Sequence, residues 1–290
     1  MLIAIWAGLA TGAIYALVAV TNNITLSQLG VFNFAQTQFL VAGAYLAYQG
    51  IEVWGLPWYG VAIGSGVCLA SAGWAQERFT IRPLGGLVAG HSATLVTTVG
   101  VATVVQGALV LKWGTTPLTV PFFGGDGSFD FLGGRLQPVD VFLFGLTACL
   151  CACLYAASSR TRWGLSGRAV TTDEDAARLR GVNVEWLSSS SFMLAGFLGG
   201  VLGPFIAAKT GVAVELSGSL LIYGFVALAI GGFGSYIGAA VGGLAVGLIQ
   251  SLVTRYFELD WFPITLFGIL LLVLIVRPTG VFGARATRSL

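Results

Sequence analysis

Long, continuous apolar runs are the feature that most constrains how this 290-residue chain can fold. The runs lie near residues 2–20, 28–49, 56–76, 91–112, 138–158, 187–208, 215–233, 237–256 and 261–276. Each is close to the ~20 apolar residues that a helix needs to cross a bilayer, whereas barrel strands would alternate apolar and polar residues over about ten positions. The sequence therefore predicts an all-α, polytopic transmembrane helix bundle of about eight to ten spans.

Composition agrees with a chain that lies in lipid. Charged residues make up 9% of the sequence, against about 25% in a typical soluble domain, and the mean hydropathy is +0.88. Residues 1–290 are therefore expected to form a single transmembrane domain. A polar interruption at 22–33 and a glycine-rich stretch at 211–238 predict broken or re-entrant helices. Residues 2–20 lack a basic leader, so we expect a retained span and not a signal peptide.

Charge and cysteine content exclude two classes of site. The net charge of +2 is too small to indicate nucleic-acid binding. Three of the four cysteines, Cys149, Cys151 and Cys153, crowd one apolar run and have no matching Cys or His pair elsewhere. We expect them to pack as small hydrophobic residues, and we predict no metal site.

Basic residues predict which loops face the cytoplasm. Ten of the fourteen lie in three segments, namely Arg78 and Arg82, then Arg160, Arg162, Arg168, Arg178 and Arg180, then Arg277, Arg285 and Arg288. Even numbers of spans separate these segments, so the positive-inside rule places all three on the cytoplasmic side. The segment 113–137 then faces outward.

Residues 160–185, called the coupling loop below, form the one long charged stretch. Within the loop, Thr171 or Thr172 can cap a short helix, and acidic residues suit its first turn. Basic residues suit its last turn, and a glycine suits a left-handed C-terminal cap. The residues concerned are Thr172, Asp173, Glu174, Asp175, Ala176, Ala177, Arg178, Arg180 and Gly181. Because so short a helix is marginal alone in water, we expect it to dock on a cytoplasmic partner. The alternative is a solvated helix on the membrane surface.

Polar side chains inside apolar runs are candidates for a solute pathway, because such groups are costly in lipid and usually face an interior. The candidates are Asn22, Asn33, Gln36 and Gln38. Hydrogen bonding between helices is the alternative for each. Glycines spaced for close helix contact also recur, at Gly196, Gly199, Gly200 and Gly203, at Gly234, Gly238 and Gly242, and at Gly243 and Gly247.

Several segments, in order along the chain, resemble the LivH-type permease of the branched-chain amino acid ABC importer family. They are GLATGAIYALVAV (8–20), LGVFNFAQTQFLVAGAYLAY (29–48), ERFTIRPLGG (77–86), TRWGLSGRAVTTDEDAARLRGVN (161–183), ALAIGGFGSYIGAAVGGLAVGLIQS (227–251) and RPTGVFG (277–283). The sequence departs from the family pattern at Ala35-Gln36-Thr37-Gln38, and at Asn22 and Asn23. Both departures fall near the predicted pathway, and they put a branched-chain substrate in doubt.

The resemblance implies a transport role without chemistry in this chain. It implies an importer of amino acids or related small polar solutes in the bacterial cytoplasmic (inner) membrane. A second, LivM-like permease subunit, two cytoplasmic ATPase subunits and an extracytoplasmic binding protein would be its partners. ATP and Mg²⁺ would bind the ATPase subunits, and the coupling loop would contact them. The chain has no GxxxxGK[ST] phosphate loop.

Two other functions compete with this interpretation. A secondary transporter driven by an ion gradient would carry charged residues within its spans, and almost none are present. An intramembrane serine protease would need a nucleophile motif, but the sequence offers one histidine, His91, at the edge of a run.

Overall fold

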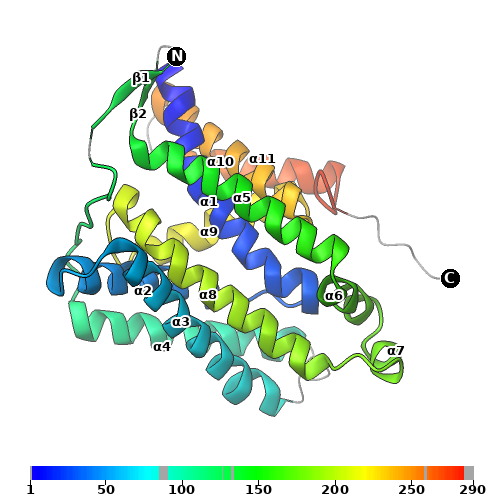
Figure 1. Ribbon diagram of the computed structural model, residues 1–290. Coiled ribbons are helices and arrows are strands. Elements are labelled where there is room, and N and C mark those ends of the chain that lie inside the picture. The colour runs from blue at the N-terminus through cyan, green and yellow to red at the C-terminus, as the bar shows by residue number, and fades with distance from the viewer. Residues whose placement is uncertain (1, 85–90, 126, 132–133, 258–259, 284–290) are drawn as a thin grey trace. The chain divides into compact units, whose positions relative to one another are not determined.

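Helices make up most of the computed structural model, which describes residues 2–84, 91–125, 127–131, 134–257 and 260–283. The α-helices are α1 (Leu2–Leu29), α2 (Gln36–Tyr48), α3 (Trp58–Gln76), α4 (His91–Trp113), α5 (Pro138–Arg160), α6 (Arg162–Thr172), α7 (Glu174–Leu179), α8 (Val184–Thr210), α9 (Leu216–Gly231), α10 (Tyr236–Tyr256) and α11 (Trp261–Val276) (Figure 1). Short π-helical turns, Gln49–Val53 and Glu77–Ile81, extend α2 and α3, and a 3₁₀ turn, Arg82–Leu84, follows the second. The strands β1 (Phe129–Phe131) and β2 (Gly134–Leu136) form one antiparallel hairpin.

Each of the nine apolar runs contains one main helix, of between 13 and 28 residues. Within the described residues, five helices are long and apolar enough to cross a membrane, namely α1, α4, α5, α8 and α10. The apolar helices α9 and α11 are shorter, at 16 residues each, and α2 and α3 fill the remaining two runs. The predicted polytopic helix bundle is confirmed.

Two local features differ from the expectation. Helix α1 is not interrupted at Asn22, because the Asn22 amide donates to the Val18 carbonyl of the preceding turn (3.1 Å). The helix continues to Leu29, and the chain turns at Gly30, whose φ of 69° is left-handed. The segment 113–137 contains the small hairpin, which no apolar pattern indicated.

The chain divides into two compact units. Unit 1 comprises Met1–Asn23, Asp126–Tyr155 and Ile222–Leu290, and unit 2 comprises Ile24–Gly125 and Ala156–Leu221. A single domain over 1–290 stays a prediction.

In unit 2, glycines of α8 let its backbone approach α2 and α3 closely. A Cβ at Gly196 would meet the Leu69 carbonyl of α3, and a Cβ at Gly203 would meet the Gly43 backbone of α2. The Ser65 hydroxyl of α3 donates to the Gly200 carbonyl (2.9 Å). Such contacts drive association where lipid removes the hydrophobic driving force. The predicted packing role of the α8 glycines is confirmed.

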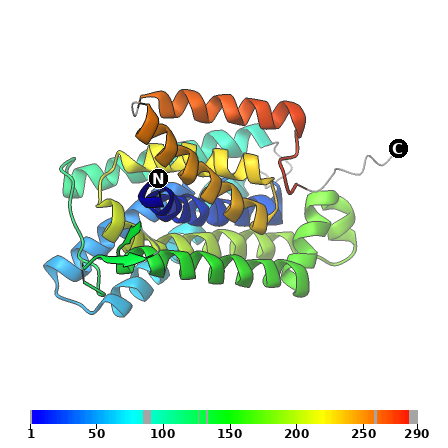
Figure 2. The ribbon, with the colours of Figure 1, turned by 90° about the horizontal axis from the view of Figure 1, so that it is seen from above.

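In unit 1, glycines of α10 pack in the same way. Gly243 and Gly247 lie against Ala16 and Gly12 of α1, and α11 runs beside α10 (Figure 2). Gly238 and Gly242 lie against α9. The prediction for Gly234 is wrong. This residue has a φ of +80° in the turn between α9 and α10, and a Cβ there would meet nothing within 4 Å.

Candidate coupling surface and translocation pathway

The coupling loop folds as two helices, where the sequence predicted one. Helix α6 begins at a cap by Thr161, whose hydroxyl accepts from the Gly164 amide (3.4 Å). Gly164 and Gly167 weaken intrinsic helix propensity, which hid α6 from sequence inspection. Both glycines are instead points of close packing, because a Cβ would meet the Ser158 carbonyl at Gly164 and the Gln28 side chain at Gly167.

Helix α7 is the predicted short helix, and its N-terminal cap corrects the expectation. Asp173 is the cap, and its carboxylate accepts from the Ala176 amide (2.9 Å). Thr171 and Thr172 end α6, where the Thr172 hydroxyl donates to the Arg168 carbonyl (2.8 Å). The threonine hydroxyls therefore bond to carbonyls of the preceding turn of α6, and the Asp173 carboxylate caps α7.

Most of the remaining α7 pattern is confirmed, except that Arg178 alone lies in the last turn and Arg180 is the C-terminal cap. Glu174 and Asp175 occupy the first turn, and Glu174 forms an i,i+4 ion pair with Arg178 (2.7 Å). Gly181 has a φ of +87°, the left-handed conformation expected of a C-terminal glycine.

One side of α7 is buried within unit 2. Ala177 is 2% exposed and joins an apolar cluster with Val31, Val170, Leu187 and Phe192. Leu179, two residues later, is 89% exposed. An apolar side chain so fully exposed at the end of a docked helix is available to a partner. Internal packing thus holds α7 in place and leaves part of its surface open.

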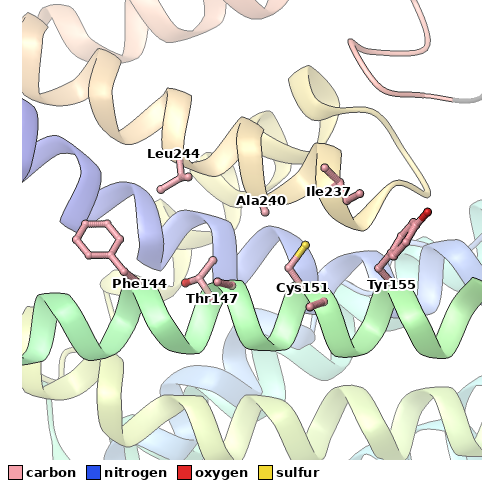
Figure 3. Close-up of a pocket in the computed structure, with 9 residues that line it drawn as sticks. Phe144, Thr147, Cys151, Tyr155, Ile237, Ala240 and Leu244 are labelled. Carbon is pink, nitrogen blue, oxygen red and sulfur yellow. The ribbon is translucent and has the colours of Figure 1, made fainter.

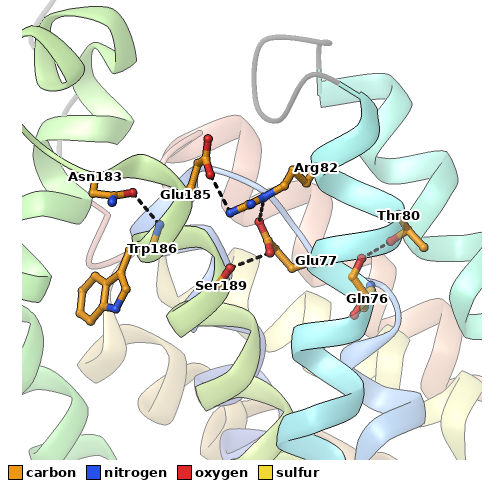
Figure 4. A network of polar contacts seen from close by, with 8 residues as sticks. All are labelled: Gln76, Glu77, Thr80, Arg82, Asn183, Glu185, Trp186 and Ser189. Carbon is orange, nitrogen blue, oxygen red and sulfur yellow. Dashed lines mark hydrogen bonds and ion pairs between the residues drawn. The ribbon is translucent and has the colours of Figure 1, made fainter.

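Polar contacts join the end of the coupling loop to the end of α3 (Figure 4). The Glu77 carboxylate is 2% exposed and accepts from the Ser189 hydroxyl of α8 (2.7 Å). Arg82 lies 3.8 Å from Glu77 and forms an ion pair with Glu185 at 2.9 Å. We call Glu77, Arg82, Glu185 and Ser189 the Glu77 network. Sequence reasoning missed it, although a carboxylate that ends an apolar run was a visible signal.

Asn33 and Gln36, two of the predicted pathway residues, bond other elements of unit 2. Asn33 and Gln76 exchange two amide hydrogen bonds, of 3.3 and 2.9 Å. The Gln36 amide donates to the Ala195 carbonyl of α8 (2.8 Å). Each of the three side chains is less than 5% exposed. These contacts favour the alternative interpretation, in which the amides bond helices together.

Gln38 is the predicted pathway residue that lines a polar cavity. The cavity has a volume of about 260 Å³, lies in unit 2 and includes Thr37, Gln38, Gln106, Glu215 and Ser217. The Gln38 amide nitrogen donates to the Ser217 hydroxyl (2.9 Å), which donates to the Val214 carbonyl (2.7 Å). Asn22 lies in unit 1, fully buried within α1.

A second cavity, of about 420 Å³, lies in unit 1 and is almost wholly apolar. Thr147 and Cys151 of α5 face Ile237 and Ala240 of α10 across it (Figure 3). The Thr147 hydroxyl donates to the Leu143 carbonyl (2.7 Å), so it offers little to a polar solute. Over the described residues, no group of three or more His, Cys, Asp or Glu side chains could hold a metal ion.

Comparison with known proteins places the chain among transport permeases. Residues 4–276 match the family described as branched-chain amino acid transport system / permease component. The chain is 27% identical to the high-affinity branched-chain amino acid transport system permease protein LivH of Salmonella typhimurium over 289 residues, 95% of this chain and 93% of the relative. It is 28% identical to the BraD permease of Pseudomonas aeruginosa, over 95% and 94% of the two chains. No solved structure matches.

These matches cover nearly the whole chain and agree with its helices. They support the ABC permease interpretation over a secondary transporter, since the relatives are permease components of transport systems and not enzymes. With the five apolar helices, they indicate a multi-pass protein of the inner membrane. The chain belongs to the family of permease components of branched-chain amino acid transport systems.

Proposed function

We propose that this chain, with a second LivM-like permease subunit, forms the membrane pathway of an ATP-driven importer of amino acids. Branched-chain amino acids are the first candidates, because the relatives' names specify them, and related small polar solutes follow. An extracytoplasmic binding protein delivers the solute. Two cytoplasmic ATPase subunits bind ATP and Mg²⁺.

The coupling loop is the proposed ATPase contact, through residues Thr172–Gly181. The observation that carries this role is the two-sided placement of α7. Ala177 is buried in unit 2, whereas Thr172, Asp173, Asp175, Arg178, Leu179 and Gly181 are exposed. Glu174 and Ala176 are half-buried. A partner can therefore contact the exposed side of α7 while the buried side stays packed against unit 2.

The Glu77 network supports transmission from this contact. Glu185 and Ser189 belong to the first turns of α8, just after α7, and Arg82 and Glu77 follow α3. A movement of α7 is thereby passed to two membrane helices of unit 2. Among the proposed pathway residues, Gln38 is favoured for solute contact because it lines the polar cavity.

Substitution of Leu179 tests the ATPase contact. Leu179→Asp places a charge at an exposed site, so the chain should fold normally, whereas a charge at Ala177 would disrupt the buried cluster. In the assembled transporter we expect solute uptake to fall at least tenfold while ATP hydrolysis continues. Leu179→Met keeps the apolar contact and is the matched control. Normal uptake by Leu179→Asp would rule out a contact at this residue.

A proteoliposome experiment tests the importer class. The purified chain alone should neither hydrolyse ATP nor accumulate leucine under an imposed ion gradient. Accumulation by the chain alone would establish a secondary transporter instead.

A further inference from the structure

The polar cavity of unit 2 offers hydrogen-bond acceptors at its base. Thr37 is 1% exposed and Gln38 is 7% exposed, and both line the cavity. The Thr37 hydroxyl oxygen and the Gln38 carbonyl oxygen have no hydrogen-bond partner among the described residues. An unpaired buried polar group costs about 1–3 kcal/mol, so a ligand that donates hydrogen bonds is favoured at the Gln38 oxygen, and the Thr37 hydroxyl can accept as well as donate.

The orientation of the Gln38 amide is fixed by its neighbours. Its nitrogen donates to the Ser217 hydroxyl oxygen, and the Ser217 hydroxyl donates its proton to the Val214 carbonyl. Ser217 therefore holds the nitrogen side of the amide and leaves the oxygen of Gln38 as the free acceptor. The nearby Thr103 hydroxyl donates to the Val99 carbonyl (3.0 Å), so it too presents oxygen lone pairs.

The charge of the lining selects a cation over an anion. Glu215 supplies a carboxylate at an exposed edge of the cavity, and no Lys, Arg or His lies among the residues that line it. The first amides of α9 offer nothing to an anion. Ser217 and Gly218 donate to the Val214 and Glu215 carbonyls (3.2 and 3.3 Å).

We propose that this cavity, from Glu215 at its edge to Thr37 and Gln38 at its base, is a subsite within one subunit for the protonated amino group of a solute. A primary ammonium brings one positive charge and three donors, which match one carboxylate and the neutral oxygens. The proposal rests on the proposed function for its physiological ligand, an amino acid. The ammonium chemistry can be tested without transport.

Thermal unfolding of the purified full-length chain, in detergent, is the test, with isobutylammonium chloride as the probe. We expect the Tm to rise by about 2 °C at a concentration five times the Kd. Tetramethylammonium chloride has the charge without N–H donors, and sodium isobutyrate reverses the charge. Neither should raise the Tm beyond an equal concentration of sodium chloride.

Variants assign the effect to the cavity. Glu215→Gln removes the charge at an exposed position, Gln38→Met removes the acceptor, and Thr37→Val removes the hydroxyl at similar size. Each should weaken isobutylammonium binding about tenfold. Glu52→Gln, an exposed acidic residue outside the cavity, is the matched control and should bind as the wild type does.

Three outcomes would overturn the subsite. They are an equal Tm rise with sodium chloride, which indicates an inorganic cation site, an equal response in Glu215→Gln and wild type, or no response to isobutylammonium at 0.1 M. Failure of the wider function has a different signature. If the assembled transporter imports no amino acid while the isolated chain binds isobutylammonium through Glu215, the subsite stands and the proposed substrate is wrong.

Discussion

At the scale of single residues, two buried amides act as a pair. Asn33 begins the turn before α2 and Gln76 ends α3, and their side chains exchange two hydrogen bonds out of contact with solvent. Asn33 also accepts from the Ala35 amide (3.1 Å), which fixes the turn that starts α2. The loss of one amide leaves its partner buried and unsatisfied, so each side chain contributes more to the free energy of unfolding when the other is present.

A double-mutant cycle on Asn33→Leu and Gln76→Leu tests this coupling. Each single variant should lower the free energy of unfolding by about 1–3 kcal/mol, because one amide loses its partner. The double variant should lose at least about 1 kcal/mol less than the sum. Chemical or thermal unfolding in detergent measures all four proteins, and strict additivity would contradict the pairing.

At the scale of elements, the contact of α3 with α8 depends on glycines, which have no side chain. Gly196 and Gly200 bring the α8 backbone against the Leu69 and Ser65 carbonyls of α3. Helix propensity alone would favour alanine over glycine by about 1 kcal/mol. These glycines therefore mark places where helix proximity outweighs propensity.

Gly200→Ala and Gly107→Ala form a matched pair for this contact. A Cβ at Gly200 would overlap the Ser65 backbone, so we expect Gly200→Ala to lower the Tm by several degrees. Gly107 lies in α4, where a Cβ meets nothing within 4 Å, so Gly107→Ala should leave the Tm unchanged or raise it. Similar Tm changes in the two variants would mean that α3 and α8 do not need this close contact.

At the scale of the whole molecule, the proposed transport function requires that movements of the coupling loop reach the membrane helices. The Glu77 network is the route that we propose within unit 2, because it connects the residues after α3 with the start of α8. Arg82 is its central cation. Since its side chain is 31% exposed, its role in stability is smaller than that of a fully buried ion pair.

Arg82→Met should therefore affect coupling more than folding. We expect a loss of about 1 kcal/mol of stability, because Glu77 stays buried without its nearby cation, and a several-fold fall in solute imported per ATP hydrolysed. Uptake and ATPase rates measured on the same assembled transporter give this ratio. Arg160→Met, in the coupling loop but outside the network, should leave this ratio unchanged, and an equal fall in both variants would argue against the network.

Local rules predicted much of this structure, and tertiary contacts decided the remainder. The apolar runs located the long helices, and Gly181 was correctly predicted as a C-terminal cap because its signal lies in the adjacent sequence. The sequence did not predict helix α6, because the reason for its glycines lies in tertiary contacts. Gly164 packs against Ser158, and Gly167 packs against Gln28.

The candidate site was less predictable for the same reason. A sequence shows that Asn33, Gln36 and Gln38 are polar residues in an apolar run, but it does not show their partners. Asn33 forms hydrogen bonds with Gln76, and Gln36 donates to the Ala195 carbonyl. Gln38 instead lines a cavity together with Glu215, which is distant in the sequence. Thr37 belongs to the segment that departs from the family pattern, but the sequence did not single it out as a pathway residue, because a single threonine in an apolar run is common.

The length of α9 has a consequence for the bilayer around this subunit. Its 16 residues rise about 24 Å, against about 30 Å for a typical hydrocarbon core. Non-helical backbone must cover the missing ~6 Å, and lipid does not tolerate such backbone exposed. The two mutual hydrogen bonds of Leu118 and Val212, both 2.8 Å, meet part of that need. Hydrophobic mismatch around α9 therefore predicts that the activity of this subunit depends on bilayer thickness.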